Sequence, residues 1–123
     1  MTEAHVDAIA DKTSTPTYTR DLAQWLPRIF KSEEGGLLHL ANHGQCSWQE
    51  YAQYALDCCR NEGIKLKAGT VGALSLDEMK NFVARRPRYT VLSTRRFEGM
   101  TGEAPRSWRD AVAEYVRDYY SKK

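Results

Sequence analysis

The chain has too few cysteines to be held together by disulfide bonds. It contains three, Cys46, Cys58 and Cys59, and an odd number with two adjacent members predicts reduced thiols in a cytoplasm. No apolar run approaches the roughly 20 residues of a membrane-spanning helix, so no membrane partner is expected. Residues 1–14 carry acids and have no apolar stretch, which argues against a secretory signal peptide.

Sequence motifs for common catalytic chemistry are also missing. There is no P-loop, no Gly-x-Ser-x-Gly elbow, and "GTVG" at 69–72 lacks the flanking strand and helix of a nucleotide-binding turn. His39, His43 and Cys46 give His-x3-His-x2-Cys, but no fourth ligand is evident, so we expect no metal. No base or oxyanion hole accompanies Cys46, and we expect no catalytic residue in this chain.

Charge is present but unevenly distributed. The 123 residues are enough for one domain, and the net charge is only +2. Residues 80–109 nevertheless hold eight Lys or Arg and only two acids, whereas residues 1–79 are acidic on balance. The basic segment can bind a phosphate or pair with the acidic remainder; on charge alone, ion-paired or solvated arginines are the simpler interpretation. No nucleic-acid-binding module accompanies it, so no nucleic acid is expected.

Periodicity predicts helices that alternate with very short strands. Residues 1–13 lack a pattern and are interpreted as a flexible leader, and residues 14–121 form the ordered part. Thr19 is expected to cap the first helix, which Pro27 interrupts. "SWQE" at 47–50 is a capping box, and "SWRD" opens the last helix. Helices are expected from about residues 19, 48, 75, 94 and 108, and strands at 36–42, 64–71 and 89–92.

These elements predict a small mixed α/β domain with about four helices and a few short strands. Strands of three to six residues do not easily make a self-sufficient sheet, which suggests that part of a larger fold is missing. The two cysteines at 58 and 59 should point to different sides of their helix, so at most one of them belongs in the core.

Four segments together resemble a known family. "STPTYTRDLAQWL", "GLLHLANHGQCSWQEYAQYAL", "RRPRYTVLSTRRFEGM" and "SWRDAVAEYV" are similar, in this order, to the C-terminal part of dTDP-4-dehydrorhamnose reductases. These enzymes are extended short-chain dehydrogenase/reductases. The resemblance covers about residues 11–120. It implies the C-terminal, substrate-binding lobe of that fold without its Rossmann domain.

The resemblance also implies what this chain lacks. The family reduces the 4-keto group of dTDP-4-dehydro-L-rhamnose with NADPH or NADH, giving dTDP-L-rhamnose. Its Gly-rich cofactor fingerprint and catalytic Tyr-x-x-x-Lys lie in the N-terminal Rossmann domain, and this chain has neither. We therefore expect no bound cofactor and no hydride transfer by this chain alone. An N-terminal Rossmann domain, in cis or in trans, is the expected partner.

The family motifs carry over to the substrate side only. Pro16 and Thr17 match the Pro-Thr of the loop near the active-site cleft, and Arg86 matches the arginine of the Arg-Pro. Arg86, with neighbouring Arg85, is the expected contact to a diphosphate or sugar of a dTDP-sugar nucleotide. Ser14 stands where the family usually has glycine, which matters if that position needs a positive φ.

Two hypotheses remain open. The chain is either the substrate lobe of a nucleotide-sugar reductase or a non-catalytic module that keeps the shape of the lobe for protein contacts, for example as a homodimer. An epimerase or dehydratase lobe is a third possibility. Those enzymes usually carry Arg-Asp-Tyr before Asp-Leu-Ala, and "PTYTRDLA" lacks it, which favours the reductase branch.

Overall fold

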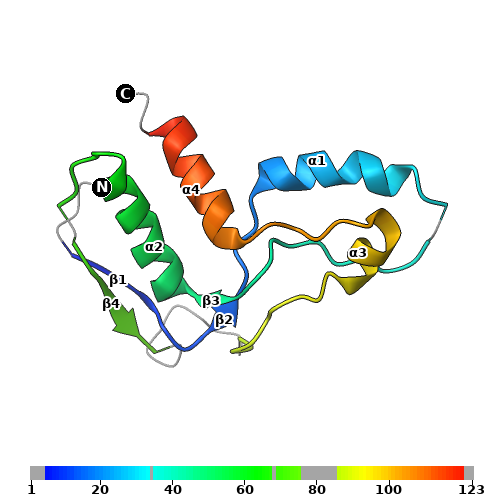
Figure 1. Ribbon diagram of the computed structural model, residues 1–123. Helices are drawn as coiled ribbons and strands as arrows, with labels where there is room; N and C mark the ends of the chain where they lie inside the picture. The colour runs from blue at the N-terminus through cyan, green and yellow to red at the C-terminus, as the bar shows by residue number, and fades with distance from the viewer. Residues whose placement is uncertain (1–4, 34, 68, 76–85, 121–123) are drawn as a thin grey trace.

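The computed structural model describes residues 5–33, 35–67, 69–75 and 86–120. Figure 1 shows two groups of elements, with α2 and α4 beside the strands β1 and β4 on one side and α1 and α3 on the other. The elements are β1 (Val6–Ile9), β2 (Thr13–Ser14), α1 (Thr19–Phe30), β3 (Cys46–Ser47), α2 (Trp48–Asn61), β4 (Val71–Leu74), α3 (Arg95–Thr101) and α4 (Trp108–Tyr119). Helices and short strands confirm the small α/β domain predicted from the sequence.

The first group is built on a parallel pair of strands. β1 pairs with β4 in the register Val6↔Val71 to Ile9↔Leu74, and α2 packs against both strands and against α4. Ile9 is only 2% exposed. The expected flexible leader over residues 1–13 is therefore wrong for Val6–Ile9: β4 supplies the hydrogen-bonding partner that an isolated four-residue strand would lack.

The core between α2 and α4 contains both neighbouring cysteines. Cys58 and Cys59 are 8% and 3% exposed, and they cluster with Val116 of α4. The expectation that at most one of them is buried is wrong. Successive residues of a helix are about 100° apart, and α4 together with the partly buried Ile64 and Leu66 covers an arc wide enough for both.

The second group is the pair α1 and α3. Trp25 of α1 and the fully buried Phe97 of α3 pack with ring centroids 5.6 Å apart. Helix α3 confirms the short helix expected from residue 94, but it continues through Gly99 and ends at Gly102, whose φ of +72° favours glycine. Phe30, the last residue of α1, is 77% exposed.

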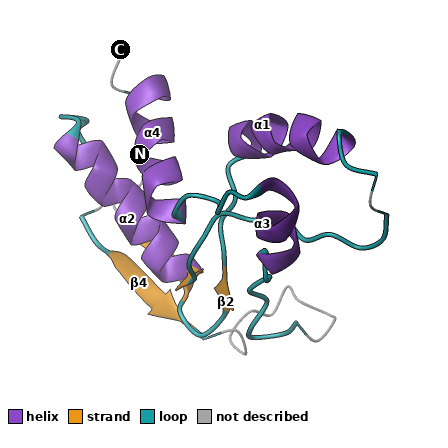
Figure 2. Cartoon of the chain, turned by 45° about the vertical axis from the view of Figure 1, so that its right-hand side comes forward, coloured by secondary structure: helices purple, strands orange, loops and turns teal. Residues whose placement is uncertain are grey.

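The two groups meet at short antiparallel and parallel pairings in the middle of the fold (Figure 2). β2 pairs antiparallel with β3, and Thr13 also bridges to Tyr89 in parallel. Ser14 lies in β2, and no non-glycine residue of the described chain has a positive φ, so serine fits where the family usually has glycine. His43 bridges to Ser107, which ties the segment before β3 to the start of α4.

Some predicted elements differ in the structure. Residues 36–42 are an irregular segment rather than a strand, because no strand of the described chain pairs with them, and Leu37 is 75% exposed. The strand expected at 64–71 forms later, as β4, and residues 89–92 contribute only the bridge at Tyr89. The helix expected from residue 75 falls largely outside the described residues. The expectation that Thr19 caps α1 is wrong: Thr19 is the first helical residue, and Tyr18 occupies the N-cap position without a side-chain capping bond.

The caps expected at the starts of α2 and α4 form in the structure. Ser47 and Glu50 form the predicted capping box, with the Ser47 hydroxyl accepting from the Glu50 N–H at 3.1 Å and the Glu50 carboxylate accepting from the Ser47 N–H at 3.0 Å. The Ser107 hydroxyl likewise accepts from the N–H of Arg109 at the start of α4. Among the helices described, none is long and apolar enough to cross a membrane.

Candidate functional site

A buried carboxylate joins the two halves of the fold. Asp21, in the first turn of α1, is 4% exposed and accepts two hydrogen bonds from Arg106, from Nε and Nη2, each at 2.9 Å. Arg106 precedes α4, and its Nη2 also donates to Glu114 of α4 at 2.5 Å. Hydrogen bonds to Asp21 and Glu114 raise the pKa of Arg106, which fixes its charge. This bidentate geometry holds α1 against the start of α4.

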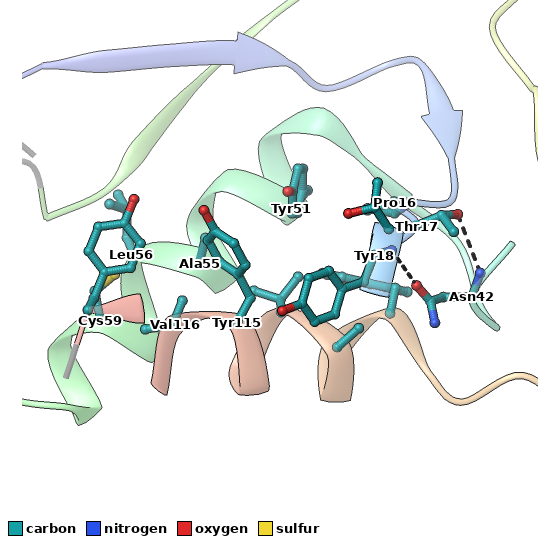
Figure 3. Close-up of a pocket in the computed structure, with 15 residues that line it drawn as sticks. Pro16, Thr17, Tyr18, Asn42, Tyr51, Ala55, Leu56, Cys59, Tyr115 and Val116 are labelled. Carbon is teal, nitrogen blue, oxygen red and sulfur yellow. Dashed lines mark hydrogen bonds between the residues drawn. The ribbon is translucent and has the colours of Figure 1, made fainter. Parts of the chain in front are cut away.

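Asn42 connects this ion pair to the segment that contains Pro16 and Thr17. Its side-chain Nδ2 donates to Asp21 at 2.8 Å, while its Oδ1 accepts from the backbone N–H of Tyr18 at 2.8 Å. Its backbone N–H donates to the Thr17 hydroxyl at 3.4 Å. Figure 3 shows the Tyr18 and Thr17 contacts as dashed lines. Asn42 is 3% exposed, so these bonds form away from water and hold residues 16–18 in position.

A cavity of about 380 Å³ opens beside this segment. We call it the aromatic cavity; it lies between α2, α4 and residues 16–19. Its lining includes the rings of Tyr18, Tyr51, Trp108, Tyr115 and Tyr120, together with Pro16 and Thr17. No charged side chain lines it. The cavity is thus suited to an uncharged, flat group rather than to an anion.

Much of the basic segment is engaged with the rest of the chain. Arg88 forms an ion pair with Asp11, and Arg96 donates to the backbone carbonyls of Gly35 and Leu37. The Arg109 guanidinium lies 4.8 Å from the ring centroid of Trp108. Together with Arg106, these contacts match the simpler interpretation of the charge pattern, in which the arginines pair within the chain.

The segment that carries Arg86 runs beside the segment that leads to Pro16. The Thr13 N–H donates to the Arg88 carbonyl at 2.6 Å, and the Thr90 N–H donates to the Thr13 carbonyl at 2.8 Å. Lys12 Nζ donates to the Thr90 hydroxyl at 3.1 Å. The contact is between Thr13 and residues 88–90, so the chain just after Arg86 pairs with the chain just before Pro16. Arg86 is exposed, and Arg85 lies outside the described residues.

Sequence reasoning missed the residues that organise this region. From the sequence alone, Asp21 is an acid in the favoured first turn of its helix, and Asn42 and Arg106 have no individual role. Their contacts span 21 to 85 residues of sequence, so no local pattern indicates them. In the sequence, these residues differ from others only as polar residues beside apolar neighbours. That pattern is too common to identify their hydrogen-bond partners.

The geometry supports neither a nucleophilic Cys46 nor a metal site formed by His39, His43 and Cys46. Burial raises the pKa of Cys46 to about 11, which keeps its thiol protonated. Cys58 and Cys59 have pKa values raised by burial as well. His39 and His43 are exposed while Cys46 is buried, and the described part of the chain holds no group of three or more metal-ligating side chains.

The described residues contain no glycine-rich turn of the kind that binds a dinucleotide cofactor. In a Rossmann fold the pyrophosphate rests on a glycine-rich turn between a parallel strand and a helix. Here β1 is parallel to β4, but it is followed by Ala10, Asp11, Lys12 and β2 rather than by such a turn. The segment that follows β1 therefore does not form such a cradle.

Comparison with known proteins gives a consistent match over nearly the whole chain. Residues 1–121 match the family model described as "RmlD substrate binding domain". The spore coat polysaccharide biosynthesis protein SpsK of Bacillus subtilis is 33% identical over 117 residues, which is 95% of this chain and 38% of the relative. A dTDP-4-dehydrorhamnose reductase of Mycolicibacterium smegmatis is 34% identical over 113 residues, covering 90% of this chain and 32% of the relative.

Solved structures agree with the sequence relatives. A dTDP-4-dehydrorhamnose reductase from Bacillus anthracis, crystallised with NADP, superposes with a TM-score of 0.81 at 22% identity and covers 96% of this chain. An orthologue from Clostridium acetobutylicum superposes with a TM-score of 0.76 at 29% identity and covers 94%. In both cases this chain spans 39% of the solved chain. The chain thus spans less than half the length of the proteins it matches.

Proposed function

Because the chain belongs to the RmlD substrate-binding domain family, we propose that it binds the dTDP-sugar of a dTDP-4-dehydrorhamnose reductase-like protein. The intact reaction would be the reduction of dTDP-4-dehydro-L-rhamnose to dTDP-L-rhamnose with NADPH or NADH. In this proposal the chain supplies the sugar-nucleotide contacts. The cofactor and the catalytic Tyr-x-x-x-Lys belong to a Rossmann domain in cis or in trans, so the chain alone is not catalytic.

The observation that carries the proposal is the pairing of Thr13 with residues 88–90. It places residues 88–90, which follow the Arg-Pro motif, alongside Thr13 of β2, which precedes Pro16 and Thr17. This pairing supports the proposal because the segments that carry the two motifs are hydrogen-bonded to one another. Asn42 in turn holds Thr17 and Tyr18 in position through two hydrogen bonds.

In the proposed site Arg86 contacts the diphosphate, with Arg85 beside it. A guanidinium presents a planar set of donors that matches phosphate oxygens, and Arg86 lies at the surface where a ligand can reach it. Lys12, whose Nζ bonds to Thr90, adds positive charge to the same region. Pro16 and Thr17 shape the adjacent wall. We further propose a cytoplasmic location, which suits three free, buried thiols.

Calorimetric titration with dTDP tests the proposal. We expect saturable binding that Arg86→Ala weakens about 10- to 100-fold, since a hydrogen bond between charged groups contributes about 1.5–3 kcal/mol. Arg95→Ala is the matched control, because Arg95 is an exposed arginine of the same basic segment, on α3. The proposal fails if the two variants bind dTDP equally well, or if the chain does not bind dTDP at about 10 mM.

A second candidate function is a protein-contact module derived from the same lobe. It is favoured by two large apolar side chains near the end of α1, Phe30 and Leu37, which are 77% and 75% exposed. Such side chains are usually covered when they belong to an interface. Light scattering of the wild type and of Phe30→Ser distinguishes the readings: a dimer that the variant disrupts supports this function, and a monomer in both contradicts it.

A further inference from the structure

Asn42 lies between a buried ion pair and the segment formed by residues 16–18. Its side-chain Nδ2 donates to the Asp21 carboxylate at 2.8 Å and to the Arg106 carbonyl at 3.3 Å. Its Oδ1 accepts from the backbone N–H of Tyr18 at 2.8 Å. The three contacts of this amide thus join segments that lie more than 20 residues away in the sequence.

The chemistry of these contacts permits only one orientation of the Asn42 amide. Nδ2 faces two acceptors, a carboxylate and a carbonyl, and Oδ1 faces a donor. With the amide turned over, Oδ1 would face both acceptors and the NH₂ group would face the Tyr18 N–H. Asn42 is 3% exposed, so each mismatched contact would carry the penalty of an unsatisfied buried group.

The Asp21 carboxylate is itself held in place. Arg106 donates to both of its oxygens, each at 2.9 Å, and Glu114 of α4 accepts from the same guanidinium. The Asp21 side chain is only 6% exposed. A fixed negative charge at this point aligns the Asn42 amide, and the aligned amide holds the Tyr18 N–H. The ion pair therefore acts on the backbone just before α1 through this amide.

We propose that Asn42 is a positioning residue for the dTDP-sugar, oriented by the buried ion pair and acting through residues 16–18. The inference rests on the proposed function, in which this segment shapes a wall of the ligand site. Because Asn42 holds the wall before the ligand arrives, binding does not have to order it. Losing the amide contacts therefore lowers affinity although Asn42 itself does not touch the ligand.

Calorimetric titration of the full chain with dTDP tests this role in the isosteric variant Asn42→Asp. At about pH 8 the new carboxylate would face that of Asp21, and we expect about three- to tenfold weaker binding because the donor to Asp21 is lost. Asn61→Asp is the matched control, because it makes the same change of atoms on an exposed residue at the end of α2. Circular dichroism at each pH establishes that the variants are folded.

The same variant supplies its own rescue as the pH falls. The charged groups that face position 42 are Asp21 of α1 and Arg106 before α4, whose other partner is Glu114. A second carboxyl beside Asp21 keeps its proton to a higher pH than usual, and its O–H then donates as the amide did. At about pH 5 we expect Asn42→Asp to bind dTDP within about twofold of the wild type at that pH. A role confined to stability gives no such recovery of affinity in a variant that is folded at both pH values.

Hydrogen exchange of the wild type provides a measurement that needs no substitution. If the bond between Asn42 and the Tyr18 N–H prepares the site, dTDP must strengthen that bond in return, because coupling is reciprocal. We expect saturating dTDP to slow exchange of the Tyr18 N–H more than exchange of the Cys59 N–H, which lies in the buried part of α2 and reports global stabilisation. Equal slowing of the two amides overturns the inference.

The outcomes separate this inference from the proposed function. If Arg86→Ala weakens dTDP binding but Asn42→Asp binds like the wild type at about pH 8, the positioning role is wrong and the proposed function stands. Weak binding by Asn42→Asp at both pH values also overturns the positioning role, since a restored donor would then not restore the site. If Asn42→Asp weakens and recovers while Arg86→Ala has no effect, the positioning role stands and the proposed contact of Arg86 fails. Absence of dTDP binding by the wild type at about 10 mM overturns the proposed function and this role with it.

Discussion

Removing one partner of the ion pair between Asp21 and Arg106 should lower the free energy of unfolding by several kcal/mol. Replacing Arg106 by methionine removes both hydrogen bonds to a carboxylate whose side chain is only 6% exposed. Asn42 then remains as the partner of that carboxylate. Removing one member of a buried pair typically costs about 3–5 kcal/mol, because the other charge stays desolvated. We expect Arg106→Met to lower the free energy of unfolding by about 3 kcal/mol.

Replacing the other partner of the pair, Asp21, should lower the free energy of unfolding by less. In Asp21→Leu the arginine side chain is still 35% exposed and keeps its bond to Glu114, so it can recover hydration. We expect a loss of about 2 kcal/mol, from the two hydrogen bonds. The double variant removes both charges together and should be more stable than the sum of the single losses predicts. A coupling energy of about 2 kcal/mol or more would result.

Urea denaturation of the four proteins measures this cycle, with the midpoint compared at constant slope. Arg20→Met is the control, because the pair Arg20–Asp118 lies at the surface and should contribute less than about 1 kcal/mol. The argument that this pair is a desolvated link between α1 and α4 is refuted in either of two cases. In the first, the loss of unfolding free energy in the double variant equals the sum of the two single losses. In the second, Arg106→Met loses less than about 1 kcal/mol.

Three further predictions concern local features. Burial raises the pKa of Cys46 from 9.0 to about 11, so the unfolded chain loses this proton first and stability should fall as pH rises between these values. Cys46→Ala should remove this loss, which amounts to as much as about 3 kcal/mol of the free energy of unfolding measured in urea. Gly44→Ala should cost about 1–3 kcal/mol, because φ is +99° and the new Cβ would lie 3.1 Å from Trp108, whereas Gly35→Ala, which meets nothing within 4 Å, should change the melting temperature little. Ser47→Ala should cost about 1 kcal/mol in thermal unfolding by removing the capping box, and an unchanged melting temperature would contradict that role.

Local patterns in the sequence predicted local structure well. The capping box of α2 and the Ser107 cap of α4 depend on hydrogen bonds between residues two or three positions apart, so they could be recognised directly. Trp108, the tryptophan of the predicted helix start "SWRD", is 1% exposed. The family resemblance, carried by four ordered motifs, is confirmed by the match over residues 1–121. The proposed roles of Pro16, Thr17, Arg85 and Arg86 stay predictions.

Pairing between distant segments was not predictable. The apolar run at 36–42 has the composition of a strand, but strand formation needs a partner, and the described chain gives it none. The unpatterned start of the chain became β1 because β4 supplied a partner 65 residues later. Burial of both Cys58 and Cys59 likewise depended on how closely α4 packs over α2.

The sequence by itself determined where helices begin, which family the chain resembles, and that catalytic motifs for hydride transfer are missing. Those properties depend on neighbouring residues or on a linear order of motifs. Only the tertiary structure decided that Asp21 bonds to Arg106 across 85 residues, that Asn42 positions residues 16–18, and that tyrosines from three segments enclose a cavity. Each of these depends on the relative placement of packed elements, and no local pattern encodes that placement.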